Sequence, residues 1–238
     1  TVDANGDAGW EAAAGGLSSD ARRNTVAGTN AGDSFHGSND ADNTLFGYDA
    51  GTAIVSGTKN TFLGAYAGAA SDDRTNNVFI GYKAGYACDA GVESVLIGSQ
   101  AGLALTGPSA SKNTLIGQNA GVSATSTEHC TILGRGSGSS ITTGTKNTFI
   151  GANGWNTTTG TNNTNLGYAA QASSATASNE ITLGNTDVTK FRIPGLNFVI
   201  KDTTATDNYV LTVDSNGEAG WEAAASGVSS DAQYNTVG

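Results

Sequence analysis

Pairs of apolar residues followed directly by glycine recur along most of this chain. Between residues 24 and 185 the pattern appears about ten times, in segments such as NTFLGAYAG from Asn60 and NTLIGQNAG from Asn113. The glycines that follow the pairs, here called the central glycines, lie 17 residues apart in most cases, with a range of 16 to 19. They are Gly28, Gly47, Gly64, Gly81, Gly98, Gly117, Gly134, Gly151, Gly167 and Gly184. Spacing of this regularity is typical of a repeat protein rather than of a single globular core.

Each repeat predicts a short strand, because β-branched, leucine and aromatic residues occupy the two places before the central glycine. Seventeen residues are too few for a strand and a packed helix, since the crossover alone takes about a dozen or more. The pattern therefore predicts an all-β fold, a parallel β-solenoid of 17-residue coils. We expect each coil to hold two short strands and two turns and to stack on the next coil.

Neighbouring residues of a strand point to opposite faces, so only one of the two apolar columns can fill the coil interior. The column directly before the central glycine is Phe46, Leu63, Ile80, Ile97, Ile116, Leu133, Ile150 and Leu166, with Leu183 after them. The column one place earlier is Leu45, Phe62, Phe79, Leu96, Leu115, Ile132 and Phe149. The outward column would form a large exposed apolar stripe, which soluble monomers avoid. We therefore expect the chain to associate with itself along this stripe, as two or three copies.

Small residues and asparagines also recur in register. Ala-Gly pairs follow six of the central glycines by three and four places, as in Ala67-Gly68, and predict a narrow interior and a corner that needs a positive φ. An asparagine four places before the central glycine predicts a stacked ladder of amide hydrogen bonds between coils. Its members are Asn43, Asn60, Asn77, Asn113 and Asn147, interrupted by Ser94 and Cys130.

The repeat of Asn-Thr, two apolar residues, glycine and then small residues resembles the head repeats of trimeric autotransporter adhesins of the YadA type. Similar stretches occur in bacteriophage tail fibres. The resemblance covers residues 24–185. It implies a left-handed β-roll in which three chains pack side by side, with apolar residues on the shared axis. This chain differs from the adhesin pattern in its longer unit and its constant Ala-Gly pair.

After Gly184 the period stops. Phe191, Ile193 and the alternating residues up to Ile200 predict strand, turn and strand around Pro194-Gly195. The segment 179–195 looks like the ends of solenoid shafts in phage fibres, which implies a β module that connects or caps the solenoid. A plain β-linker is the alternative.

A longer repeat joins the two ends of the chain. Residues 1–27 and 212–238 share 20 of 27 positions at an offset of 211 residues. We therefore expect a tandem array, with a connector end at 1–23, a β-roll at 24–185, a connector or cap at 186–234 and a new β-roll from 235 to 238. Trp10 and Trp221 are equivalent and predict anchors of the connector's apolar core. The Asn-Gly dipeptides at 5–6 and 216–217 predict hairpin turns.

Charge excludes several partner classes. The net charge is −10 with only 11 lysines and arginines, which disfavours nucleic acid and anionic membrane surfaces. No apolar run approaches the roughly 18 residues of a spanning helix, so we expect no membrane insertion. We expect no cofactor and no metal, because two cysteines without a CxxC motif give no zinc site. Cys88 and Cys130 are predicted to be free and buried.

Catalysis is not expected, because converging groups are absent from the pattern. His36 and His129 lie far apart in a linear array, and His129 beside Cys130 is predicted to be a surface residue next to a stacked thiol. The carboxylates of Asp40, Asp42, Asp72 and Asp73 are expected in solvated outer turns, as are Ser56–Lys59 and Thr143–Lys146.

The favoured function is a structural shaft segment of a long trimeric fibre, extracellular or on a virion, most simply a phage tail fibre that supports attachment to a host surface. The alternatives are a bacterial cell-surface adhesin, a giant extracellular repeat filament and, less favoured, a module that binds a host-surface glycan or protein. A glycan site could use Tyr48, Tyr66, Tyr82 and Tyr168, but they lie at different offsets from the central glycine, and we expect no single aromatic ladder. A carbohydrate-cleaving β-helix would need paired carboxylates about 5–10 Å apart on one face.

Overall fold

The computed structural model describes residues 18–35, 40–88 and 92–192 and the strand backbones at 209–213 and 219–223. The chain divides into two compact units, Thr1–Thr189 and Lys190–Gly238. The first unit holds the repeats and is a β-solenoid of about nine turns, as the periodicity predicted.

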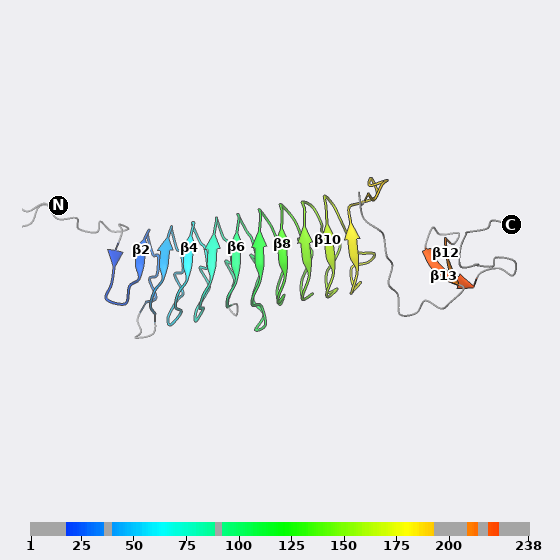
Figure 1. Ribbon diagram of the computed structural model, residues 1–238. Helices are drawn as coiled ribbons and strands as arrows, with labels where there is room; N and C mark the ends of the chain where they lie inside the picture. Colours follow the sequence, from blue (N-terminus) through cyan, green and yellow to red (C-terminus); the bar gives the residue numbers. More distant parts are fainter. Residues whose placement is uncertain (1–17, 36–39, 89–91, 193–208, 214–218, 224–238) are drawn as a thin grey trace, which may run out of the picture. The chain divides into compact units, whose positions relative to one another are not determined.

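Ten three-residue strands lie side by side in one parallel sheet, in sequence order and without a register shift (Figure 1). Thr61 of one coil pairs with Val78 of the next, and the two residues that follow each of them pair in the same way. The strands are β2 (Thr25–Ala27), β3 (Thr44–Phe46), β4 (Thr61–Leu63), β5 (Val78–Ile80), β6 (Val95–Ile97), β7 (Thr114–Ile116), β8 (Thr131–Leu133), β9 (Thr148–Ile150), β10 (Thr164–Leu166) and β11 (Ile181–Leu183).

The first edge of this sheet is covered by the chain itself. Strand β1 (Ser18–Ser19) pairs antiparallel with β2, so that Ser18 lies opposite Val26 and Ser19 opposite Thr25. An open edge of a parallel sheet invites pairing with another chain, and a short antiparallel strand blocks it.

The prediction of two strands in each coil was wrong. Among the described residues, the remaining sides of the coils carry a single isolated bridge, Thr58 with Thr75. Hydrogen bonds between coils continue there, for example from Gly51 N–H to Ala67 O at 2.9 Å. Left-handed residues recur in this part of every coil, such as Lys83 at φ +56° and Gly85 at φ +57°. They turn the chain so often that no second strand can extend.

Three columns of side chains fill the interior. The middle residue of each strand from β3 to β9 is buried, and Phe62 and Phe79 stack with ring centroids 4.6 Å apart. The alanines of the Ala-Gly pairs from Ala50 to Ala120 are fully buried as well. A third buried column, which the sequence analysis did not identify, lies seven residues after the central glycine. It contains Ile54, Ser71, Cys88, Leu105, Ala124 and Ile141.

The central glycines bring the backbones of successive coils into contact. From Gly28 to Gly167 they adopt φ between +124° and +141°, a region that other residues rarely enter. A Cβ added to Gly81 would lie 2.6 Å from both the carbonyl carbon and the oxygen of Gly98. The glycine is therefore required both by its backbone angle and by the space between coils.

The second unit contains one antiparallel pair, β12 (Tyr209–Val213) and β13 (Ala219–Ala223), in which Leu211 lies opposite Trp221. The Asn216-Gly217 turn predicted from the sequence falls in their connection, outside the described residues. Trp10, His36 and the Pro194-Gly195 turn also lie outside the described residues, and the side chain of Trp221 is not described.

Candidate functional site

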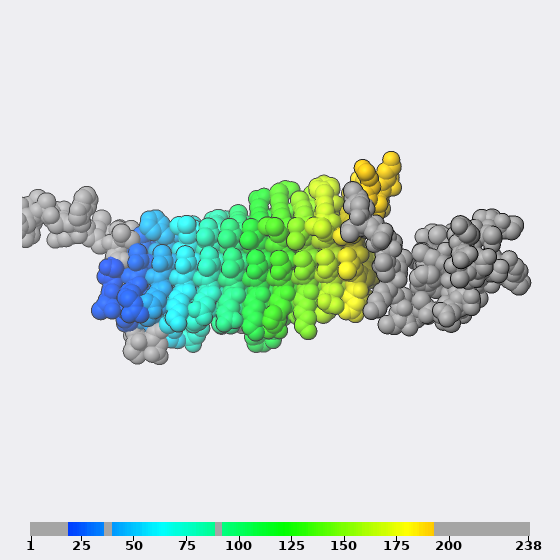
Figure 2. Space-filling view, viewed as in Figure 1, coloured from blue at the N-terminus to red at the C-terminus, as the bar shows by residue number. Residues whose placement is uncertain are grey.

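The outer face of the parallel sheet is the largest regular surface of the solenoid. Both the first and the third residue of each strand point outward, because the middle residue points inward. The first position is threonine, valine or isoleucine in every coil, and the third is aromatic or aliphatic from β3 onward. Side chains of successive coils line up in rows (Figure 2).

The column directly before the central glycine is the outward one. Among its members Phe46, Leu63, Leu133, Ile150, Leu166 and Leu183 expose between 37% and 51% of their surface, and Ile80, Ile97 and Ile116 are partly exposed. These nine residues are called the apolar stripe below. Its neighbouring column, from Leu45 to Phe149, is at most 3% exposed. The structure thus separates the two apolar columns that the sequence could not assign to a face.

The asparagines form a buried chain of hydrogen bonds from coil to coil. Asn43 Oδ1 accepts the backbone N–H of Asn60 at 3.0 Å, and Asn60 Oδ1 accepts that of Asn77 at 3.1 Å. The side-chain amides also donate to backbone carbonyls, as Asn113 Nδ2 does to Thr127 O at 2.7 Å. Asn24 and Asn163, which lie in register with the predicted five, belong to the ladder as well.

The ladder meets an acidic residue at each end, through the carboxylate of Asp20 and through the backbone N–H of Glu180. Asp20 accepts hydrogen bonds from the backbone N–H and the Nδ2 of Asn24, at 2.9 and 3.0 Å. At the other end Glu180 donates its backbone N–H to Asn163 Oδ1, while its carboxylate binds Ser173. Partial desolvation tends to raise the pKa of Asp20, but the hydrogen bonds from Asn24 and Arg22 outweigh it and hold the pKa below its ordinary value.

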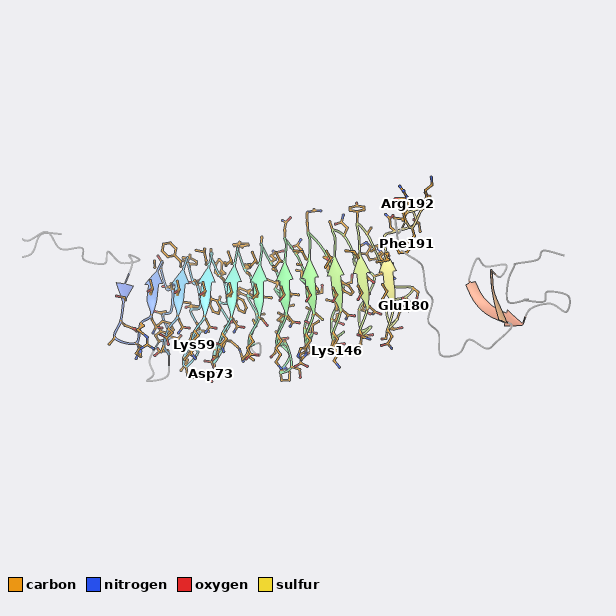
Figure 3. All side chains as sticks on the ribbon, in the orientation of Figure 1. Lys59, Asp73, Lys146, Glu180, Phe191 and Arg192 are labelled. Carbon is orange, nitrogen blue, oxygen red and sulfur yellow. The ribbon has the colours of Figure 1, made fainter. Side chains whose placement is uncertain are left out.

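One of the acidic residues predicted on the surface is buried. Asp40 is inaccessible to solvent, and its Oδ1 lies 2.8 Å from Arg22 Nε. Asn24 Nδ2 donates to the backbone oxygen of Asp40 at 2.9 Å. The first coil thus closes with an ion pair that the repeat pattern does not contain. Asp72 and Asp73 are exposed as predicted, and Lys59, Asp73 and Lys146 lie along one edge of the stack (Figure 3).

Three tyrosines that the sequence analysis treated as unrelated lie in contact. The ring centroids of Tyr48 and Tyr66 are 5.2 Å apart, and those of Tyr66 and Tyr82 are 6.1 Å apart, both with edge-to-face geometry. Tyr86 joins them, and Lys83 Nζ lies between 5.3 and 5.7 Å from three of the ring centroids. This is a cluster rather than a stacked ladder. Tyr66 lies one place further from its central glycine than Tyr48 and Tyr82 do, but the rings are large enough to touch despite this difference.

The chemistry of the cysteines is that of structural thiols. Neither forms a disulfide, and both are buried. Cys130 occupies a ladder position, with Sγ 3.4 Å from Gly144 O, and burial raises its pKa to about 11. The neighbouring His129 is exposed and turned away by a left-handed φ of +56°. A thiol with this pKa is a poor nucleophile at neutral pH.

Within the described residues no three His, Cys, Asp or Glu side chains gather as ligands for a metal ion. In the same part of the chain, no helix has the length and apolarity that a membrane span requires. Comparisons with protein-family models, with curated proteins and with solved structures found no match for this chain. The apolar stripe is therefore the feature on which a functional proposal can rest.

Proposed function

We propose that this chain is a structural shaft segment of a long extracellular or virion fibre, in which three copies pack through the apolar stripe. The observation that supports the proposal is the stripe itself, which runs unbroken through nine coils on one face of a regular sheet. Fully burying a leucine, isoleucine or phenylalanine side chain stabilises by about 1.5–3 kcal/mol. Six side chains that expose 37–51% of their surface, with three partly exposed isoleucines between them, thus leave a large free energy for association.

The neighbouring outward column supports the same role. Threonine and valine side chains flank the stripe; most are partly exposed, and Thr44 and Thr131 are exposed. They add methyl groups without bulk, so that a second sheet or the edge of another solenoid can approach closely. Many small coils held by backbone contacts also suit a part that transmits force rather than one that opens around a substrate.

Tandem organisation fits a fibre. The offset of 211 residues between the two copies of the 27-residue segment places a connector after each solenoid. Ser229–Asp231 and Asn235 repeat the residues that close the first coil, Ser18–Asp20 and Asn24. Each new solenoid would then begin with the same antiparallel edge strand and the same carboxylate cap.

The mass of the 238-residue chain in solution tests the proposal. Light scattering after size exclusion is expected to give about three times the 23.8 kDa of one chain. A double variant, Ile116→Glu with Leu133→Glu, should shift the mass to that of one chain because charge cannot be buried at an apolar contact. Val55→Glu is the matched control, because Val55 is an exposed apolar residue outside the stripe. A monomeric wild-type chain would overturn the proposal, and a stable dimer would overturn the threefold arrangement.

A phage tail fibre is the favoured setting, on the resemblance of the repeats and of the segment 179–195. A bacterial surface adhesin is the alternative. An antibody against the solenoid, applied to purified virions and to intact cells, distinguishes the two settings by the particle that it labels.

A further inference from the structure

A groove late in the solenoid carries two exposed aromatic side chains that the fold does not use. The groove has a volume of about 430 Å³ and crosses the coils between Asn119 and Tyr168. Trp155 exposes 55% of its surface and Tyr168 exposes 64%. Trp155 stands four residues after the central glycine, where six other coils have the corner glycine of the Ala-Gly pair. A tryptophan this open buries too little area to serve mainly in packing.

Polar groups with hydrogen-bonding capacity lie beside these rings. Asn153 Nδ2 donates to the Tyr168 hydroxyl at 3.3 Å, and Arg135 Nε donates to Gln118 Oε1 at 3.3 Å. The Oδ1 of Asn119, which also lines the groove, is buried and accepts no hydrogen bond from the described residues. A buried acceptor without a donor is costly, and a turn of the Asn119 amide toward the groove would let a ligand hydroxyl satisfy it.

This combination matches the chemistry of a sugar ring. One face of a hexose presents C–H groups, which pack on the electron-rich face of an indole or phenol, and its edge presents hydroxyls for amide and guanidinium groups. The groove is open along its length, which suits a chain of sugars rather than a compact cofactor. Arg135 is the one charged residue among the described residues that line it. With a net charge of −10 on the chain, a single cation favours an uncharged ligand over a polyanion.

We propose that the groove between Trp155 and Tyr168 binds a neutral oligosaccharide, with Trp155 as the main stacking platform and Asn119 as a hydrogen-bond acceptor. None of the groove residues belongs to the apolar stripe. The proposed site does not depend on the trimer. A solenoid carrying this site would hold a glycan along its side rather than only at a distant tip.

Saturation-transfer NMR on the full 238-residue chain tests the site, because it detects weak binding. The probes are neutral hexasaccharides of glucose, mannose and galactose, with an alginate hexasaccharide as the acidic comparison. At least one neutral probe is expected to bind, and Trp155→Ala should weaken it by about tenfold or more. Trp155→Phe should retain part of the affinity, and Asn119→Ala should weaken binding without changing the stacking contact.

Tyr48→Ala is the matched control, because Tyr48 is an exposed aromatic residue in the separate tyrosine cluster. It should leave binding unchanged. Light scattering on the same Trp155→Ala sample should give the wild-type mass, which separates loss of sugar binding from loss of assembly or folding. Failure of all neutral probes, binding of the acidic probe alone, or equal binding by Trp155→Ala would each overturn the proposal.

Discussion

The inner and outer faces of the parallel sheet carry similar apolar residues in different surroundings. Leu96 is fully buried against its own chain, while the adjacent Ile97 is partly exposed to solvent. The inner face is covered by the rest of each coil, and none of the described residues packs over the outer face. Composition alone would treat both columns as core. The difference teaches that the alternation of strand residues, not their hydrophobicity, decides which column stabilises the fold and which is available for a partner.

On the buried side, the positions with backbone contacts between coils tolerate substitution least. We expect Gly81→Ala to cost more than about 3 kcal/mol, because the new Cβ would lie 2.6 Å from the Gly98 backbone and φ is +132°. Gly136→Ala is the matched change on the open side, where the nearest atom is the flexible Asn153 Oδ1 at 3.3 Å and φ is +63°. It should cost about 1–2 kcal/mol. Urea unfolding followed by circular dichroism measures both, and equal losses would contradict the stacking argument.

Neighbouring side chains on the two faces give the direct test of the comparison. In the dissociated Ile116→Glu, Leu133→Glu background, Leu96→Ala is expected to lower the free energy of unfolding by about 2–5 kcal/mol through the cavity it leaves. Ile97→Ala in the same background should lose less than about 1 kcal/mol, because water already reaches that side chain. In the otherwise wild-type chain, association between copies is the second measurement. There Ile97→Ala should have the larger effect of the two variants, because it should weaken association. Similar losses from both variants in the dissociated background would refute the assignment of faces.

The strand positions, the alanine column and the asparagine ladder could be predicted because one residue type recurs at each of them. The third interior column could not, because Ile54, Ser71 and Cys88 share a position but not a character. Aligning the repeats on their central glycines and comparing the residues seven places later would have revealed this column. The absence of a second strand follows from left-handed residues such as Lys83, whose residue type does not predict a positive φ.

The outer features were harder to predict, for a physical reason. Interior positions are constrained by packing against the coils above and below, whereas outer positions are constrained only by solvent or by a ligand. Trp155 therefore appears once, and its proposed role depends on Tyr168 in the next coil. Asp40 looked like a surface carboxylate because its partner Arg22 belongs to the irregular start of the first coil.

Placing an asparagine at the Cys130 position of the ladder tests the comparison of buried and exposed faces with a smaller expected effect. Cys130 keeps the ladder only through weaker sulfur contacts with Asn147 and Gly144 O, while its backbone N–H donates to Asn113 Oδ1 at 3.0 Å. Cys130→Asn should replace the sulfur contacts with amide hydrogen bonds and raise the free energy of unfolding by about 1 kcal/mol. His129→Asn is the control on the exposed side, and it should gain only through relief of the left-handed φ. Thermal unfolding of both variants decides the question, and a loss of stability in Cys130→Asn would show that the sulfur packs better than the amide.

The smallest effect is expected where the buried ladder meets solvent, at Asp20. Its folded pKa is held below the ordinary value, so its contribution is present above about pH 4 and is lost as the pH falls through the folded pKa. Asp20→Asn keeps an acceptor for Asn24 but does not titrate. Between about pH 7 and about pH 3, the free energy of unfolding should therefore decrease less in the variant than in the wild type. Glu180→Gln is the matched change at the other end, where hydrogen bonds from Ser173 also hold the pKa low. If Asp20→Asn shows the same acid dependence as the wild-type chain, the carboxylate is not acting as the cap of the ladder.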